Sequence, residues 1–124
     1  MLRVSNGRQA ALLAGDIEQA QEARLASAGA AIRADLLLVP HHGSKTSSSE
    51  AFLEAVNPSL AIVQAGYRNR FGHPAAPVLD RYRQKDVTVI DSPRCGAARW
   101  HSTDPARVAC QRDVEPRYWH HRIP

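Results

Sequence analysis

The sequence predicts an α/β domain in which helices flank a mixed β-sheet, and three observations support this class. Short, mostly apolar segments of four to six residues, the length of buried strands, recur at 9–14, 36–39, 59–64 and 87–90. Helix-forming stretches separate the later runs from one another. The 124-residue chain is 44% hydrophobic and 23% charged, which is enough apolar material for one core. Alternating strands and helices imply mixed α/β layers.

The elements of the first half follow from local signals. Residues 2–5 and 9–14 predict a strand pair, because Asn6-Gly7 between them suits a hairpin turn. Residues 18–28 are rich in Ala, Gln, Glu and Arg and predict a helix that ends near Gly29. The continuous apolar run at 36–39 then predicts a short buried strand.

The second half continues the alternation. Residues 50–56 predict a helix that Asn57-Pro58 terminates, and Ser49 is expected to cap it. The runs at 59–64 and 87–90 predict strands, with a helix from Pro77 to about Gln84 between them. Residues 97–100 predict one more strand. No apolar run approaches the ~20 residues that span a bilayer.

Potential metal ligands follow three of the apolar runs. Asp16 follows the first run, His41 and His42 follow the second, and His73 follows the third after a basic loop. In α/β folds, loops after buried strands present ligands and catalytic groups. A carboxylate with imidazoles in this arrangement is typical of a binuclear metal centre. Taken singly, each has a structural alternative: helix capping for Asp16, and turn chemistry for His73-Pro74.

These residues also carry a resemblance to a known family. The stretches are Leu-Leu-Ala-Gly-Asp-Ile-Glu at 12–18, Val-Pro-His-His-Gly-Ser-Lys at 39–45, and Gly-Tyr-Arg-Asn-Arg-Phe-Gly-His-Pro at 66–74. They resemble the carboxy-terminal half of the metallo-β-lactamase-like domain of the ComEC family, the competence proteins that carry DNA across the bacterial inner membrane. The resemblance covers about residues 2 to 100 and does not extend into the last two dozen.

The resemblance implies a fold and a metal site. Residues 1–102 would form the second half of an αββα metallo-β-lactamase-like sandwich. For residues 103–124 the prolines and charged residues themselves, and not the resemblance, predict an irregular, partly mobile tail. Asp16 stands where the family bridges two metals, His42 or its neighbour His41 where it places a later imidazole, and His73 at its last imidazole. The implied cofactor is Zn²⁺ or Mn²⁺, and the implied reaction is phosphodiester hydrolysis by a metal-activated water.

One part of the family pattern is missing. The first metal-binding cluster of the superfamily, His-x-His-x-Asp-His, lies upstream of the Gly-Asp motif, and no such run occurs in this chain. We therefore expect half of a catalytic domain, which by itself binds no metal and has no nuclease activity. Its expected partners are DNA, the upstream half of the domain and membrane segments of the parent. The parent would reside in the bacterial inner membrane, and this part would be soluble, on a side that the sequence does not fix.

The positive charge is concentrated in the second half of the chain. Residues 1–65 carry a net charge of −1 and residues 66–124 a net charge of +5. Either a genome rich in G and C or a phosphate-facing surface explains this bias, because arginine's planar fork suits phosphate. The predicted DNA-binding residues combine cations with an aromatic ring and an amide: Lys45, Tyr67, Arg68, Asn69 and Arg70.

The last part of the chain leaves alternatives open. Cys95 and Cys110 are compatible with a disulfide or with two free thiols, and we expect free thiols. Tyr118 and Trp119 either belong to a mobile tail or fold back onto the sheet.

Three functions compete at this stage. The chain is part of a ComEC-type metal-dependent nuclease for DNA uptake, a degenerate relative that binds DNA without cleaving it, or part of a superfamily hydrolase for another phosphoester. The upstream ligand cluster distinguishes them, because hydrolysis requires it.

Overall fold

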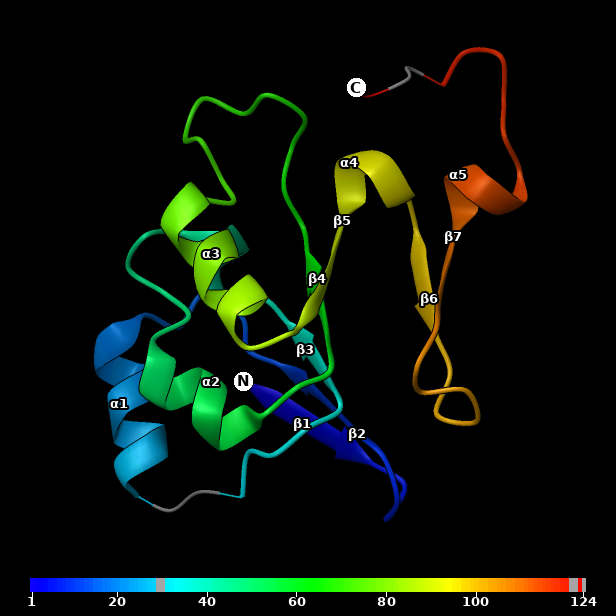
Figure 1. The fold of residues 1–124 in the computed structure, drawn as a ribbon. Coiled ribbons are helices and arrows are strands. Elements are labelled where there is room, and N and C mark those ends of the chain that lie inside the picture. Colours follow the sequence, from blue (N-terminus) through cyan, green and yellow to red (C-terminus); the bar gives the residue numbers. More distant parts are fainter. Residues whose placement is uncertain (29–30, 121–122, 124) are drawn as a thin grey trace.

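The main sheet has five strands in the order β1-β2-β3-β4-β5. A computed structural model of the chain describes residues 1–28, 31–120 and 123. β1 pairs antiparallel with β2, and the remaining pairs are parallel. The strands are β1 (Leu2–Ser5), β2 (Ala10–Leu13), β3 (Leu36–Leu38), β4 (Leu60–Val63) and β5 (Thr88–Asp91). The prediction of a mixed sheet with flanking helices is confirmed (Figure 1).

Three helices connect the parallel strands: α1 (Gln19–Ser27), α2 (Glu50–Val56) and α3 (Ala76–Gln84). Parallel crossovers are almost always right-handed, so three successive crossovers in one direction place their helices on the same face. Figure 1 shows these helices together on one side of the strands. Asn57 ends α2 in the left-handed conformation, with φ 48°. The predicted end of the first helix, Gly29, lies outside the described residues.

The face of the sheet toward the helices is the core. One row across the strands joins Leu12, Leu37, Ala61 and Val89 in register. The first three are fully buried, and Val89 packs against the same cluster. Helix residues such as Phe52 and Val78 fill the space above this row, with no exposed surface. This burial of apolar area is the main stabilising term of the fold.

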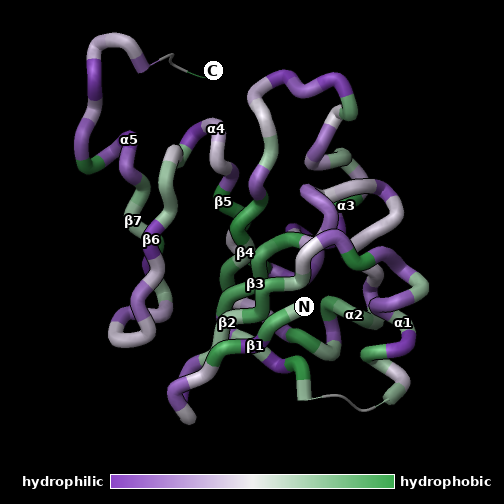
Figure 2. The backbone as a smooth tube through the Cα atoms, turned by 180° about the vertical axis from the view of Figure 1, so that it is seen from behind, coloured by the Kyte–Doolittle hydropathy of each residue, from purple (hydrophilic) through white to green (hydrophobic). Residues whose placement is uncertain are grey.

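The opposite face is also apolar but only partly covered. The adjacent row joins Leu13, Leu38, Ile62 and Ile90 in register. Leu13 is exposed and the other three are half-buried. Figure 2, seen from behind, shows the hydrophobic colour running along the strands while the loop between β4 and α3 is hydrophilic. Because side chains alternate across a strand, a continuous apolar run places apolar residues on both faces.

The chain after β5 forms a small disulfide-bonded unit. It comprises α4 (Ser92–Cys95), β6 (Ala98–Trp100), β7 (Val108–Cys110) and α5 (Gln111–Val114). β6 and β7 form an antiparallel pair, so the predicted boundary at residue 102 falls inside a hairpin. The prediction of an irregular segment is therefore wrong for residues 108–114. Short strands without strong alternation gave no periodic signal there.

The expectation of free thiols is also wrong. Cys95 and Cys110 form a disulfide that joins the start of the hairpin to its end, with the Cα atoms 4.5 Å apart. Their separation of fifteen residues did not reveal this, because the pairing depends on the hairpin that brings them together. Tyr118 is 96% and Trp119 62% exposed, so these rings do not fold back onto the sheet. Among the described residues, no helix is long and apolar enough to cross a membrane.

Candidate metal and nucleic-acid site

The predicted ligands meet at one edge of the sheet. β2, β3, β4 and β5 are parallel, so the loops that follow them emerge at the same edge. Hydrogen bonds join these loops. The amide of His41 donates to the carbonyl of Gly15 at 3.0 Å, and the Ser92 hydroxyl exchanges hydrogen bonds with both backbone groups of Ala65. The edge is therefore a connected frame.

The turn after β3 has an unusual backbone. It is a short 3₁₀ element, η1 (Pro40–Gly43), in which His41, His42 and Gly43 have φ values of 48°, 56° and 78°. Left-handed conformations are uncommon for residues with a Cβ, and the sequence alone gave no indication of two in succession. This backbone turns the two imidazoles out of the strand direction toward the loops on either side.

Gly43 connects this turn to the loop that carries His73. A Cβ on Gly43 would lie 2.7 Å from Cβ and 3.0 Å from Cα of Pro74, so only glycine permits this approach. The amide of Ala75 donates to the Gly43 carbonyl at 2.9 Å. The His73-Pro74 peptide bond is cis. The close contact places His73 beside the His41-His42 turn.

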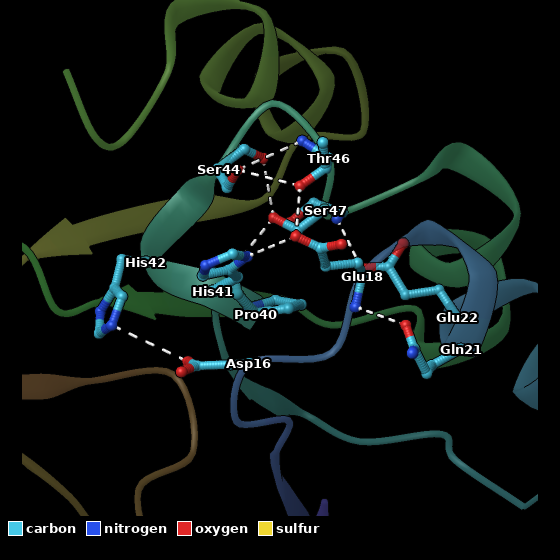
Figure 3. Close-up of polar contacts among 11 residues, drawn as sticks. Asp16, Glu18, Gln21, Glu22, Pro40, His41, His42, Ser44, Thr46 and Ser47 are labelled. Atoms are coloured by element: carbon cyan, nitrogen blue, oxygen red, sulfur yellow. Dashed lines mark hydrogen bonds and ion pairs between the residues drawn. The ribbon is translucent and has the colours of Figure 1, made fainter. Parts of the chain in front are cut away.

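His42 and Asp16 face each other at the surface. Nδ1 of His42 lies 2.8 Å from the carbonyl oxygen of Gln64, so the proton belongs on Nδ1 in the neutral ring. Nε2, the unprotonated nitrogen in that tautomer, lies 3.8 Å from Oδ1 of Asp16 (Figure 3). The Asp16 and His42 side chains are 72% and 53% exposed, so the pair is open to solvent.

His41 instead faces Glu18. Its Nδ1 lies 3.0 Å from Oε1 of Glu18, and the Thr46 hydroxyl donates to the same oxygen at 2.9 Å (Figure 3). The contact with His41 has the distance of an ion pair but lacks hydrogen-bond geometry, so this buried nitrogen has no hydrogen-bond partner. Glu18 also begins α1, and its amide donates to the Gln21 side chain at 3.1 Å. A carboxylate behind an imidazole is the usual way to orient a histidine ligand.

His73 lies in a row of rings at the same edge. Its ring centroid is 6.3 Å from that of His41 and 5.9 Å from that of Phe71, with Phe71 stacked on it at 22°. Nδ1 of His73 is buried and has no hydrogen-bond partner. The structure thus brings all four predicted ligand residues into one neighbourhood. Within the described residues, no three His, Cys, Asp or Glu side chains form a group able to hold a metal ion.

The predicted DNA-binding loop lies between β4 and α3. Arg68 stacks on the Tyr67 ring at 5.2 Å, and Arg70 stacks on the Phe71 ring at 4.8 Å. Both arginines are exposed, as is Lys45 on the neighbouring loop. Asn69 stabilises the loop itself, because its amide donates to the carbonyls of Gly66 and His73 at 2.9 and 2.6 Å. Both of its donors are thereby used within the loop.

A second polar group lies beneath the site, and sequence reasoning missed it. Buried Glu22 on α1 accepts hydrogen bonds from the amides of Ser48 and Ser49, at 2.6 and 2.8 Å. These amides precede α2, so Glu22 fixes the backbone that leads into this helix. Ser49 does occupy the N-cap position, but its hydroxyl has no partner, so the predicted side-chain cap is wrong.

Helix α3 completes this buried group. Arg81 donates to the carbonyls of Ser47 and Ser48, and the Tyr82 hydroxyl lies 3.0 Å from that of Ser48. Burial raises the pKa of the Tyr82 phenol well above its usual range, so it remains a neutral hydrogen-bonding group. Helices α1 and α3 therefore hold the loop of residues 43–49 from inside.

The residues that sequence reasoning missed differ in whether the sequence carries a signal for their role. Glu18 stands two positions after Asp16, where the predicted helix begins, so a structural part accounts for it. Phe71 lies in the loop that carries the family resemblance, whereas Gln64 acts through a backbone carbonyl that any residue supplies. Glu22 and Arg81 carry no sequence signal, because their partners lie 26 or more positions away.

Comparison with known proteins found relatives that are much longer than this chain. The chain is 35% identical over 101 residues to Competence protein ComA of Neisseria gonorrhoeae, covering 81% of this chain and 15% of that protein. It is similar to competence proteins. ComE operon protein 3 of Bacillus subtilis strain 168 is 33% identical over 81% of this chain and 13% of its own length. The uncharacterized protein YcaI of Escherichia coli strain K12 is 34% identical over 97% of this chain and 16% of its own length.

These coverages have two consequences. The chain spans about one sixth or less of the length of these relatives, and no protein-family model matches it. The similarity to YcaI leaves out only 3% of the chain, so it includes most of residues 103–124. The similarity therefore extends beyond the expected limit near residue 100, into the disulfide-bonded unit.

Proposed function

We propose that this chain forms part of a competence protein for DNA uptake, and that it supplies one side of a metal-dependent site for phosphodiester hydrolysis. The competence role is supported by the names of its relatives, ComA and ComE operon protein 3. The hydrolytic role is supported by the edge of the sheet at which Asp16, His41, His42 and His73 meet.

One observation carries the proposal: the orientation of His42 toward Asp16. The Gln64 carbonyl fixes the proton on Nδ1, which leaves Nε2 as a ligand atom 3.8 Å from a carboxylate oxygen. Two atoms bound to one metal at about 2.0–2.2 Å each are separated by roughly 3–4 Å. Imidazole and carboxylate together suit Zn²⁺ and Mn²⁺. A hydrogen bond on the far nitrogen of a histidine is the usual support for a ligand.

His41 and His73 lie beside this pair, with ring centroids 6.4 Å apart for His41 and His42 and 6.3 Å apart for His41 and His73. Nδ1 of His73 is buried without a hydrogen-bond partner, which costs stability unless a further group binds it, whereas Nδ1 of His41 lies 3.0 Å from Oε1 of Glu18. Asp16 and His42 would hold the ion, with His73 nearby and Glu18 orienting His41. The remaining ligands of this proposal come from outside these residues. A bound divalent ion would supply Lewis-acid polarisation of a phosphoryl oxygen and a lowered pKa for water.

The partly covered face of the sheet supports the proposed half-sandwich. The row Leu13, Leu38, Ile62 and Ile90 is apolar, and its solvent exposure has no benefit for an isolated sheet. A second sheet packed on this row would complete an αββα sandwich. The polar edge would then lie at one end of both sheets, where ligands from each are able to meet.

The test uses a chimaera in which this chain replaces the matched 101-residue segment of ComA of N. gonorrhoeae. We expect the purified chimaera to hydrolyse single-stranded DNA with Mn²⁺. Asp16→Asn and His42→Gln should each reduce the rate by about a hundredfold or more, because even the loss of a group that only orients a ligand costs 10–100-fold. Asp113→Asn, an exposed acid outside the site, is the matched control. Equal rates for all four proteins would contradict the proposal.

A further inference from the structure

An open pocket lies directly beside the His42–Asp16 pair. It has a volume of about 440 Å³ and mostly apolar walls, formed by His42, Gln64, Gly66, Phe71, His73 and neighbouring residues. This volume lies in the range of sites for small organic ligands. His42 and His73 belong both to the pocket and to the proposed metal site, so a molecule in the pocket would lie next to that site.

Phe71 gives the pocket a flat aromatic surface. The ring is 67% exposed, although it is one of the largest apolar side chains in the chain. It stacks on the imidazole of His73, and the guanidinium of Arg70 lies 4.8 Å from its centroid. A row of a cation and two rings, exposed at the mouth of an apolar pocket, is the arrangement on which nucleic-acid bases stack.

The walls of the pocket are already held in place. Asn69 bonds to both backbone groups of His73 and to Gly66, and Ser92 bonds to both backbone groups of Ala65. These polar groups are satisfied within the protein, so they present little to a ligand. The exposed Gln64 side chain is the amide at this surface that can pair with the polar edge of a ring. The pocket thus suits a flat ring with one polar edge.

Charge around the pocket favours an anionic ligand with such a ring. Arg68 and Arg70 are exposed on the same loop, and Lys45 is exposed on the loop before α2. A nucleotide combines the two parts, because its phosphate suits cations and its base suits a stacking surface.

We propose that this pocket binds one base of the DNA strand next to the phosphate at the metal site, with Phe71 as the stacking surface. This proposal rests on the proposed function, which identifies DNA as the substrate. Recognition is by stacking, so it tolerates all four bases. Gln64 contacts the edge of the base, and Arg68 and Arg70 contact phosphates on its flank.

The experiment measures the affinity of the whole chain for two 12-nucleotide single strands, one of thymidines and one abasic, by fluorescence anisotropy. Phe71→Ala should weaken binding of the thymidine strand by about tenfold, the loss of one stacked base. It should leave binding of the abasic strand unchanged. Phe71→Trp should retain the affinity for the thymidine strand. Tyr118→Ala, which removes an exposed ring outside the pocket, is the matched control.

The outcomes separate this proposal from the one on which it rests. Equal losses on both strands, or none on either, would overturn the base pocket while DNA binding itself stands. Failure of the unmodified chain to bind either strand would also overturn the base pocket, while hydrolysis by the chimaera decides the proposed function. Phe71 is exposed, so the variant should fold; an unchanged melting temperature checks this.

Discussion

Two groups of polar side chains lie at the segment of residues 40–49, one toward the core and one at the surface. In the inner group, Glu22, Arg81 and Tyr82 are each hydrogen-bonded to loop atoms. In the outer group, Asp16 and His42 face each other at 3.8 Å in solvent, and Nδ1 of His41 has no hydrogen-bond partner. The side chains of the first group are all hydrogen-bonded, whereas Asp16 and His42 are open to solvent. The inner group therefore stabilises the loop, whereas the outer group depends on the loop for its position.

The largest test of this comparison is Glu22→Ala. The change leaves the buried amide of Ser48 and the part-buried amide of Ser49 without an acceptor, so the free energy of unfolding should fall by about 3–5 kcal/mol. Urea denaturation followed by circular dichroism measures it. Glu54→Ala removes an exposed acid paired with Lys85 and should cost less than about 1 kcal/mol. A similar loss of unfolding free energy in Glu22→Ala and Glu54→Ala would show that the buried group contributes no more than an exposed ion pair.

Gly43→Ala tests the joint between the two loops of the outer group. The new Cβ would meet Pro74 at 2.7 Å in a residue with φ 78°, and we expect a loss of about 2–4 kcal/mol. Gly15→Ala is the matched control, because φ is 68° but no atom lies within 4 Å of the added Cβ. It should lose only the backbone cost, about 1 kcal/mol. A control that loses as much as Gly43→Ala would show that the contact with Pro74 is unimportant.

Tyr82→Phe tests the inner group by pH. At neutral pH the loss of the hydrogen bond to Ser48 should cost about 1 kcal/mol. Burial raises the pKa of Tyr82 above the value of 10.0 expected in the unfolded chain. The unfolded phenol therefore ionises first, and stability is lost as pH rises above about 10. The phenylalanine variant should lose less stability between pH 9 and 11; parallel pH profiles would contradict the burial of this phenol.

The smallest effect is expected for Asp16→Asn. Because Asp16 is 72% exposed, the melting temperature should stay within the change that corresponds to about 0.5 kcal/mol. Differential scanning calorimetry measures it. A clear destabilisation would place Asp16 among the structural groups, and a clear stabilisation would show that its carboxylate is a liability when no cation is bound.

Local signals predicted most of the fold. The Asn6-Gly7 turn, the apolar run at 36–39 and the Asn57-Pro58 stop each mark an element that the structure contains. The parallel order also explains why Asp16, His42 and His73 meet, since each follows a strand of the same sheet. The different orientations of His41 and His42 were not predictable. They depend on backbone angles and on a carbonyl of another loop.

The missed features are those that depend on contacts distant in the sequence. Glu22 looks like any acid on an Ala-rich helix, and its burial follows from the position of the Ser48–Ser49 backbone. The Cys95–Cys110 bond follows from a hairpin whose strands are three residues long, too short for a periodic pattern. Tertiary contacts decide both, and one sequence does not show them.

The left-handed backbone at His41 and His42 also determines which substitutions are favourable at these two positions. Glycine or asparagine adopts such angles at lower cost, so a sequence optimised only for folding would place them at both positions. Imidazoles there carry a conformational penalty that the rest of the molecule offsets, through Gly43, Pro74 and the groups beneath the loop. Substitutions that increase stability at these two positions would therefore replace the imidazoles and keep the turn. Retention of histidine at both would indicate selection for chemistry, against the preference of the backbone.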